Sequence, residues 1–344
     1  MKVRRVTIAD VAREAGVSMM TVSRVINRKG DVSEETAARV MEAIERLGFR
    51  PSSIARSLAT RRTKTLGLVM PDVANAFFAD VARGAEHKAY AEGYSIFLCN
   101  TEESVERELA VLASLEEKRV DGLVLCSSRL SDEELAEVLP RFPSVVLVNR
   151  TWARDDTLSV IVDDEAGSRV ATRHLIATGH RAIGFLVGPP QSFSGRRRMA
   201  GYETVLKEEG IDLNPAWIRR CLPMVDAAEV AAQRLLTEHP ELDALLCYND
   251  LVAVGALKAC RELGRRVPED LAVVGFDDIP LAELVTPPLT TCRVPRYELG
   301  VQAMDLLLRR INGEPIPSPQ IVLQPELVIR RSAPNTHAEG AIDS

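Results

Sequence analysis

The sequence predicts a multidomain protein in which a small all-α headpiece precedes a larger α/β core. Residues 7–27 have the pattern of two short helices around a tight turn, whereas residues 65–330 alternate apolar strand-like runs with helical stretches. Residues 1–63 contain 13 Lys and Arg and 7 Asp and Glu, which gives them a net charge of +6. The whole chain has a net charge of −6, so residues 64–344 carry a net charge of −12. A basic head on an acidic body favours a nucleic-acid-binding module attached to another unit, and the alternative is a chance cluster of charge.

Composition excludes several classes of protein. The 344 residues suffice for two or three domains, and 46% hydrophobic with 27% charged residues is typical of a soluble globular protein. No apolar run is long enough for a transmembrane helix, and the basic N-terminus lacks the apolar stretch of a secretory signal, so a cytoplasmic location is expected. The six cysteines are scattered, which predicts reduced core residues and no metal or cofactor site.

The first two helices are expected to be fixed by their end residues. Thr7 is predicted to cap the first helix, with Asp10 completing a capping box, and Gly16 allows the turn. Ser18 then caps the second helix. The inward-facing residues are predicted to be Val11, Ala12, Ala15, Val22, Val25 and Ile26. Small hydroxyls, an arginine and an asparagine remain on the other face, which suits a DNA major groove but also fits an ordinary helical hairpin with a solvated face.

A third helix and a short connecting segment follow. Ser33 is predicted to cap this helix and Gly48 to end it. Its apolar stripe is expected to consist of Ala37, Val40, Met41, Ile44 and Leu47. Pro51 then precedes a short amphipathic stretch over residues 54–59, which is marginal as an isolated helix in water and is therefore interpreted as a plain linker on local pattern alone.

From residue 65 onward the pattern predicts βαβ units and parallel sheets covered by helices on both faces. Strands are expected at 65–71, 94–100, 120–128, 143–150, 158–164, 181–188, 243–250, 271–278 and 321–330. Helices are expected at 78–92, 105–118, 132–139, 166–178, 196–210, 227–238, 251–263 and 296–312. Two such sheets indicate two Rossmann-like subdomains with a ligand-binding cleft at the carboxyl ends of their strands.

Polar residues fall at several of these strand ends, where a cleft would collect them. They include Asn149, Asn249 with Asp250, and Asp277 with Asp278. Three consecutive arginines, residues 196–198, open the helix that follows the strand ending near residue 188. These side chains are candidates for ligand binding, and the alternative is that they cap helices and form surface ion pairs.

The N-terminal string carries a more specific signal. Residues 7–18 read T-I-x-D-V-A-x-x-A-G-V-S and residues 21–27 read T-V-S-R-V-I-N, an ungapped match that resembles the helix-turn-helix of the LacI/GalR (lactose-repressor) family of bacterial transcription regulators. Later motifs extend the resemblance from about residue 5 to 331. It implies a ligand-responsive repressor that binds a palindromic DNA operator as a homodimer. It also implies a bilobal core similar to periplasmic binding proteins, with a small-molecule effector, a sugar or related metabolite, in the cleft.

The resemblance also implies roles for single residues. In the family, P-x-x-x-A-x-x-L, here residues 51–58, is a hinge helix that orders on DNA and wedges its leucine into the minor groove. The implied DNA-binding residues are Thr7, Ser18, Met19, Met20, Thr21, Ser23, Arg24, Asn27, Ala55 and Leu58. Because the two methionines lack hydrogen-bond donors, base preference is expected to rest on methyl contacts and on Arg24 binding guanine. The implied effector-binding residues are Phe77, Phe78, Asn149, Arg196, Arg198, Asn249 and Asp277.

The expected domains follow the same scheme. Residues 1–50 form the DNA-binding headpiece, 51–63 the hinge helix or linker, and 64–331 the effector-binding and dimerisation core. Within the core, one subdomain is expected at about 64–163 plus 294–320 and the other at about 164–293 plus 321–331. Residues 332–344 are expected to form a disordered tail without leucine heptads.

Two other functions are compatible with an α/β core. A sugar-binding transport protein would need a signal peptide, which the N-terminus lacks, and would not need a helix-turn-helix. A Rossmann-type enzyme would be expected to carry GxGxxG, GxxxxGK[ST] or GxSxG, and none of these motifs is present. The five histidines show no metal spacing. We therefore expect a regulator and not an enzyme.

Overall fold

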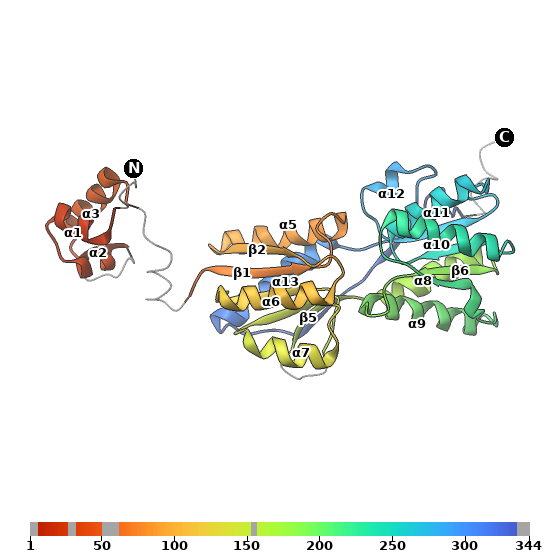
Figure 1. Cartoon of the computed structure of the whole chain (residues 1–344), viewed down its shortest axis with the longest axis horizontal. Helices are drawn as coiled ribbons and strands as arrows, with labels where there is room; N and C mark the ends of the chain where they lie inside the picture. Colours follow the sequence, from red (N-terminus) through yellow and green to blue (C-terminus); the bar gives the residue numbers. More distant parts are fainter. Residues whose placement is uncertain (1–5, 27–31, 50–61, 153–156, 336–344) are drawn as a thin grey trace. The chain divides into compact units, whose positions relative to one another are not determined.

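The computed structural model describes residues 6–26, 32–49, 62–152 and 157–335 (Figure 1). The chain separates into two compact units, Met1–Lys64 and Thr65–Ser344, which are called the headpiece and the core below. Within these described ranges, no helix is both long and apolar enough to cross a membrane.

The headpiece consists of three helices, α1 (Ile8–Ala15), α2 (Met19–Ile26) and α3 (Glu34–Leu47). The predicted capping box is confirmed, because the Asp10 N–H donates to Thr7 Oγ1 at 3.4 Å and the Thr7 N–H donates to Asp10 Oδ2 at 3.0 Å. Gly16 ends α1 with a φ of 64°, a left-handed conformation that glycine adopts without strain. The Ser18 cap is also confirmed, with Oγ accepting the Thr21 N–H at 3.1 Å.

The headpiece core is small and draws on all three helices. Val11, Val22 and Val40 are each fully buried. Met41, predicted to belong to the α3 stripe, is instead 48% exposed, and Ala43 is buried in its place. The prediction was wrong because successive helical residues are 100° apart, so a stripe through Val40, Ala43, Ile44 and Leu47 leaves Met41 outside it.

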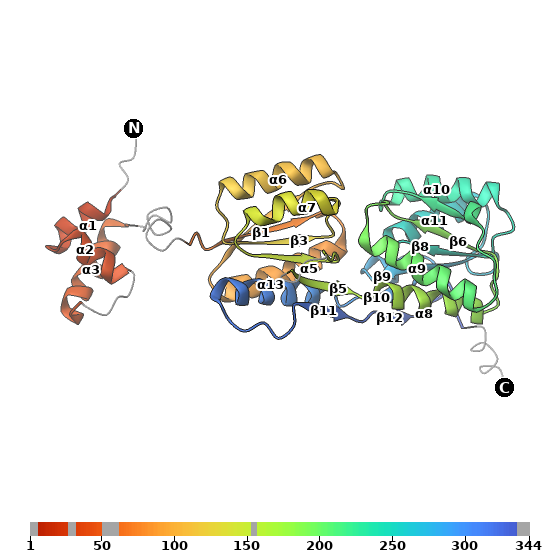
Figure 2. The ribbon, with the colours of Figure 1, turned by 90° about the horizontal axis from the view of Figure 1, so that it is seen from below.

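The first lobe of the core is a six-stranded parallel sheet in the order β11-β5-β4-β3-β1-β2. Its strands are β1 (Thr65–Met70), β2 (Ser95–Asn100), β3 (Gly122–Cys126), β4 (Val145–Val148), β5 (Leu158–Val162) and β11 (Gln320–Leu323). Figure 2 shows α5 (Ala76–Ala91) and α13 (Arg296–Asn312) on one side of the sheet and α6 (Val105–Glu117) and α7 (Asp132–Val138) on the other.

The second lobe has a six-stranded sheet in the order β12-β10-β9-β8-β6-β7. Its strands are β6 (Ile183–Val187), β7 (Ile218–Arg220), β8 (Ala244–Cys247), β9 (Ala272–Asp277), β10 (Thr290–Arg293) and β12 (Glu326–Val328). β12 pairs antiparallel with β10, so this sheet is not wholly parallel as predicted. Helices α8 (Asp164–Ala177) and α9 (Phe193–Glu208) pack on one face, α10 (Val225–Glu238) and α11 (Asp250–Glu262) on the other, and α12 (Leu281–Leu284) follows β9.

The chain passes between the lobes three times: after β5, after β10 and after β11. The predicted single strand at 321–330 is two strands in different sheets, and residues 321–323 belong to the first lobe, not to the second. Pro325 separates the two strands, since proline cannot donate to a strand ladder.

The second lobe also extends past its predicted end at residue 331. The Ser332 Oγ donates to the Val273 carbonyl at 2.6 Å and accepts the Thr290 N–H at 2.8 Å, and Ala333 is 2% exposed. Residues 332 and 333 are therefore part of the folded core and not of a tail. The rest of the predicted tail, from residue 336, lies outside the described residues.

Candidate functional site

The outer face of α2 combines apolar and cationic side chains. Met19 and Met20 are 55% and 67% exposed, although both are large and apolar. Arg24 is exposed on the same short helix, and Thr21 and Ser23 are half-buried beside it. A partner that binds this face of α2 would therefore contact methyl groups, hydroxyls and one guanidinium.

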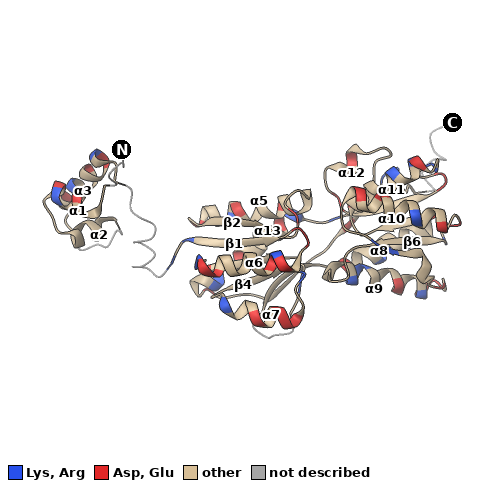
Figure 3. Cartoon of the chain, in the orientation of Figure 1, with Lys and Arg blue, Asp and Glu red and all other residues tan. Residues whose placement is uncertain are grey.

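Most of the other headpiece arginines are engaged within the headpiece, where α1 and α3 carry charges of both signs (Figure 3). Arg13 pairs with Asp10 at 3.4 Å, Arg39 donates to the Ala15 carbonyl at 3.1 Å, and Arg46 pairs with Glu14. Of the arginines in the described parts of the headpiece, Arg24 alone has no ion pair or hydrogen bond. Its five N–H donors are available for an external acceptor.

Thr7 and Ser18 lie at the first turns of α1 and α2 and serve there as caps. Their hydroxyls also bond within the turn, Thr7 Oγ1 to Asp10 Oδ2 at 2.7 Å and Ser18 Oγ to Thr21 Oγ1 at 2.9 Å. Three further predicted DNA-binding residues, Asn27, Ala55 and Leu58, lie outside the described residues.

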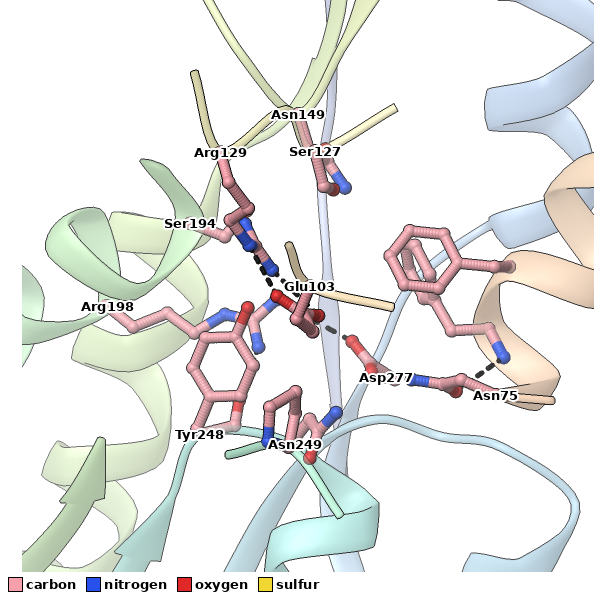
Figure 4. A pocket seen from close by; sticks show the side chains of 13 residues that line it. Asn75, Glu103, Ser127, Arg129, Asn149, Ser194, Arg198, Tyr248, Asn249 and Asp277 are labelled. Atoms are coloured by element: carbon pink, nitrogen blue, oxygen red, sulfur yellow. Dashed lines mark hydrogen bonds and ion pairs between the residues drawn. The ribbon is translucent and has the colours of Figure 1, made fainter. Parts of the chain in front are cut away.

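A second candidate site is a pocket between the two lobes of the core, at the carboxyl ends of both sheets (Figure 4). Strand order reverses between β1 and β3 in the first sheet and between β6 and β8 in the second, and ligands bind at such switch points. The predicted effector-binding residues that line it are Phe77, Phe78, Asn149, Arg198, Asn249 and Asp277. The lining residues that the effector prediction missed are Asn75, Glu103, Ser127, Arg129, Ser194, Pro223 and Tyr248.

Arg196 is the predicted effector-binding residue that does not line this pocket. Its side chain is exposed, and Nη1 donates to the carbonyls of Pro190 at 3.2 Å and Gln191 at 3.1 Å. Residues 196 and 198 are about 200° apart around a helix, so α9 cannot turn both side chains toward the same cavity. The structure therefore places Arg196 outside this pocket, and an effector-binding role for it stays a prediction.

Arg198 is buried and is held on every side. Nε donates to Asp164 Oδ1 at 2.8 Å, Nη2 lies 3.6 Å from Asp277 Oδ1, and Nη1 donates to the Tyr248 carbonyl. The guanidinium carbon is 3.6 Å from the ring centre of Phe276 and 5.1 Å from that of Tyr248. Because its cation is balanced by carboxylates and stacked on aromatic rings, Arg198 forms a fixed wall of the pocket.

Asp277 is buried opposite Arg198 and is difficult to ionise. Desolvation raises its pKa to about 7, the neighbouring Arg198 cation lowers it, and the Asp164 carboxylate raises it again. The Asp277 carboxyl therefore changes protonation near neutral pH. It can act as a hydrogen-bond donor when protonated and only as an acceptor when ionised.

A second arginine, Arg129, reaches the pocket from the end of β3. Its Nε and Nη2 donate to the two carboxylate oxygens of Glu103 at 2.6 and 3.1 Å, a bidentate pair drawn in Figure 4. Its backbone N–H donates to Glu108 Oε2 at 3.0 Å, and burial raises the pKa of Glu108. The pair brings one positive and one negative charge to the pocket, so it adds no net charge there.

Four of the lining residues have left-handed backbone conformations although none is glycine. The φ angles are 58° at Glu103, 48° at Ser127, 50° at Asn149 and 111° at Asp277. Such conformations are strained for residues with a Cβ and gather at functional sites. The strain at these strand ends turns the side chains into the cavity, and no single local sequence motif marks it.

The side-chain oxygens of two of the asparagines that line the pocket accept hydrogen bonds from backbone amides of the protein. Asn149 Oδ1 accepts the Val162 N–H at 3.2 Å, and Asn249 Oδ1 accepts the Val252 N–H at 3.0 Å as the cap of α11. Their amide nitrogens remain as donors for a ligand. Phe77 and Phe78 meet edge to face with ring centres 5.0 Å apart and provide an apolar wall.

The side chains that line the pocket are mixed in chemistry. Over the part of the chain that the structure describes, no three His, Cys, Asp or Glu side chains are grouped so as to hold a metal ion. The pocket offers donors, acceptors and apolar rings from both lobes, with its charges balanced, and this set suits a small neutral ligand with several hydroxyl groups.

Comparison with known proteins matches both units of the chain. Residues 7–52 match the family described as bacterial regulatory proteins, lacI family, and residues 172–333 match a periplasmic binding protein-like domain. The chain is 38% identical over 333 residues to the HTH-type transcriptional repressor PurR of Aliivibrio fischeri (strain MJ11), covering 96% of this chain and 98% of that protein. It is 37% identical over 326 residues to the ribose operon repressor of Halalkalibacterium halodurans, covering 95% and 96%.

Solved structures give the same picture. A lac repressor dimer bound to operator and the anti-inducer ONPF aligns with a TM-score of 0.85 at 30% identity, covering 96% of this chain and 100% of that one. A complex of the transcriptional regulator CelR with cellobiose aligns with a TM-score of 0.72 at 33% identity, covering 95% and 100%.

Proposed function

The chain belongs to the lacI family of bacterial regulatory proteins, and we propose that it is a DNA-binding transcriptional repressor controlled by a small molecule in the interlobe pocket. The family consists of repressors and not of enzymes. The observation that carries the proposal is the outer face of α2, which exposes Met19, Met20 and Arg24 and where Arg24 makes no ion pair or hydrogen bond with any described residue.

We assign sequence reading to this face of α2. Arg24 would donate two hydrogen bonds to the N7 and O6 atoms of a guanine, and Met19 and Met20 would contact thymine methyl groups in the major groove. The family resemblance adds DNA-binding roles for Thr7, Ser18, Thr21, Ser23 and Asn27, and minor-groove roles for Ala55 and Leu58. The headpiece function is assigned to residues 1–50 and the hinge to 51–63.

We further propose that the protein acts as a homodimer on a palindromic operator, as two-fold symmetry requires. Two regions of the core support self-association, because each exposes apolar side chains. On the first lobe, Leu98 in the edge strand β2 is 51% exposed and Tyr90 is 76% exposed. On the second lobe, Met224 and Leu284 are 55% and 77% exposed. Exposed edge strands and apolar patches of this kind are features of interfaces.

The effector is proposed to be a neutral sugar or related polyhydroxyl metabolite. Arg129 is balanced by Glu103 and Arg198 by Asp164 and Asp277, so no uncompensated cation is left for a phosphate or carboxylate group. Asparagine amides and Asp277 match ring hydroxyls, and Phe78 offers an apolar face. Among the relatives, one is a ribose operon repressor, and one regulator is in complex with the sugar cellobiose.

Control of DNA binding would follow from the position of this pocket between the lobes. An effector with different affinities for two relative orientations of the lobes shifts the balance between them. The first lobe continues directly into the hinge segment, so its orientation sets the spacing of the two hinge segments in a dimer. That spacing decides whether both headpieces can bind one operator.

The test of the DNA-binding function is selection of duplexes from a random pool by the full-length protein near physiological salt. Enrichment of a palindrome supports the proposal, and its sequence identifies target promoters. If no duplex is enriched, the selection is repeated with a mixture of neutral sugars, sugar phosphates and nucleobases, because a corepressor would then be required. Absence of enrichment in both selections would contradict the repressor function.

The effector class is tested separately by thermal unfolding of the full-length protein against the same three classes of compound. A ligand that binds only the folded state raises the melting temperature by mass action. We expect stabilisation by a neutral sugar and none by sugar phosphates. Stabilisation by a sugar phosphate or a nucleobase alone would overturn the assignment of the pocket chemistry.

A further inference from the structure

Arg296 connects the two lobes at one of the three crossings of the chain. It is the first residue of α13, directly after the chain returns from β10 to the first lobe. Its Nε donates to Asp80 Oδ2 of the first lobe at 3.1 Å, and its Nη1 donates to the backbone carbonyls of Asp277 and Asp278 in the second lobe. The side chain is 14% exposed, so these contacts are made largely out of water.

The second-lobe end of this contact is a strained turn. Asp277 and Asp278 have φ angles of 111° and 54°, and both are non-glycine residues. Within the second lobe, Asp278 is held by Arg293 at 2.7 Å and by Arg330 at 2.7 Å. The Arg296 guanidinium binds the carbonyl oxygens of the same turn from the first lobe, so it acts directly on the backbone that aims Asp277 into the pocket.

The first-lobe end is rigid. Asp80 lies on α5, one turn after the pocket residues Phe77 and Phe78. Helices α5 and α13 are in direct backbone contact, because a Cβ at Gly84 would lie 2.1 Å from the Tyr297 carbonyl oxygen and a Cβ at Gly300 would lie 2.0 Å from that of Val81. Arg296 and the aromatic wall of the pocket therefore belong to one tightly packed pair of helices.

We propose that Arg296 is an interlobe clamp, a positioning residue that holds the Asp277–Asp278 turn of the second lobe against the α5 end of the first lobe. The clamp fixes the distance between the Phe77–Phe78 wall and the Asp277 carboxyl, and it sets how readily the pocket opens. It is built from the protein alone and needs no ligand. The inference concerns the core and stands independently of the DNA-binding function.

The test is hydrogen–deuterium exchange of the full-length protein without ligand, comparing wild type with Arg296→Met. The variant keeps the aliphatic stem and removes all three hydrogen bonds. We expect at least tenfold faster exchange in two peptides, one covering residues 277–281 and one covering residues 76–81. The Ile279 N–H, which donates to Asp250 Oδ2 at 2.8 Å, is a suitable reporter in the second lobe.

Arg83→Met is the matched control. Arg83 pairs with the same Asp80 at 3.0 Å, but its side chain is 59% exposed and its described partners lie in the first lobe. The Arg83→Met variant removes a cation from Asp80 but leaves the Asp277–Asp278 turn unchanged. We therefore expect hydrogen exchange at residues 277–281 to stay at the wild-type rate. Equal effects of Arg83→Met and Arg296→Met on that peptide would contradict the clamp.

A double-mutant cycle separates a clamp from a merely structural role. If Asp80 acts on the turn only through Arg296, adding Asp80→Asn to Arg296→Met causes no further increase in hydrogen exchange at residues 277–281. Arg296→Lys, which keeps one charged donor group and avoids gross loss of folding, is expected to restore part of the protection. Additive effects, or faster exchange confined to the first turn of α13, would overturn the proposal.

Discussion

The headpiece and the core place their functional side chains in opposite environments. On α2, Arg24 is exposed and makes no ion pair or hydrogen bond with any described residue. In the pocket, Arg198 is buried and contacts Asp164, Asp277 and the Tyr248 carbonyl. The N–H donors of Arg24 can therefore bind an external hydrogen-bond acceptor without breaking an internal contact. The pocket, in contrast, is held together before any ligand binds. Substitutions are therefore expected to separate into those on α2 that alter binding and those in the pocket that alter stability.

The largest expected effect is that of Arg198→Ala on the core. Removing the cation leaves the Asp164 and Asp277 carboxyls buried without a counter-ion, and breaking a buried pair in this way costs about 3–5 kcal/mol. Thermal unfolding of the full chain measures this loss. Arg196→Ala, two residues away on the exposed side of α9, serves as the control and should change stability little. Similar losses in both variants would contradict the buried-network description.

The next largest effect is expected at the exposed site. Arg24→Ala should weaken binding to the selected operator by about 1–3 kcal/mol and relax specificity at one position of each half-site, without changing the melting temperature. Fluorescence anisotropy with the selected duplex and single-base variants measures both quantities. Arg13→Ala, on α1 and paired with Asp10, is the comparison. Uniform weakening across all duplexes would reassign Arg24 from base reading to phosphate contact.

The pocket should also make stability depend on pH. The folded-state pKa of Asp277 is raised to about 7, so between about pH 4 and 7 the native state binds the proton that the unfolded chain has released, and stability falls as pH rises. The slope for one such group is at most about 1.4 kcal/mol per pH unit. Asp277→Asn should therefore gain stability relative to wild type from pH 5 to pH 7.

Asp270→Asn is the control for this pH experiment. The Arg266 side chain lowers the pKa of the half-buried Asp270, so any stability from its charge is already complete above about pH 4 and is lost only in acid. Its melting temperature should run parallel to that of wild type between pH 5 and 7. A parallel course for Asp277→Asn as well would show that Asp277 ionises normally in the folded protein.

The smallest expected effect is that of the α1 cap. Thr7→Ala removes the acceptor for the Asp10 N–H and should cost about 1 kcal/mol of headpiece stability. Hydrogen exchange in α1 of the full-length protein should accelerate about fivefold, while exchange in the core stays unchanged. Ser33→Ala, which removes the equivalent cap of α3, should act in the same way on α3. Unchanged exchange in α1 would mean that packing alone holds this helix.

The sequence predicted the elements whose signals are local. Caps at Thr7, Ser18 and Ser33 and the long apolar strands follow from neighbouring residues, and the structure confirms them. Helices α5 and α9 begin two or three residues before their predicted starts, because Asn75 and Ser192 cap them. β7 and β10 were not predicted, since the strings I-R-R and T-T-C-R are too short and too polar to form an apolar run.

The pocket was predictable only in part. Asn149, Asn249 and Asp277 were predicted because they end long strands. Glu103 and Arg129 lie on loops after β2 and β3, and their bidentate pair depends on a fold that brings together residues 26 positions apart. A signal for them would have been the strand ends themselves, because every loop at that edge of a parallel sheet faces the cleft. Arg196 lies outside the pocket because residues 196 and 198 point to different sides of α9. Met41 has helical spacing from Ala37 and Ile44, but the buried stripe of α3 is turned toward Ala43.

Because the chain crosses between the lobes three times, neither lobe can fold completely until the last strands have been synthesised. The first lobe starts at Thr65, yet its sheet is complete only when β11 (Gln320–Leu323) has joined it, and the second lobe waits for β12. During synthesis, α5 therefore leaves the ribosome more than 200 residues ahead of α13, the helix against which Gly84 packs. Neither lobe can finish folding on a chain cut short before residue 323. Truncated chains would therefore expose apolar surface to aggregation and proteolysis.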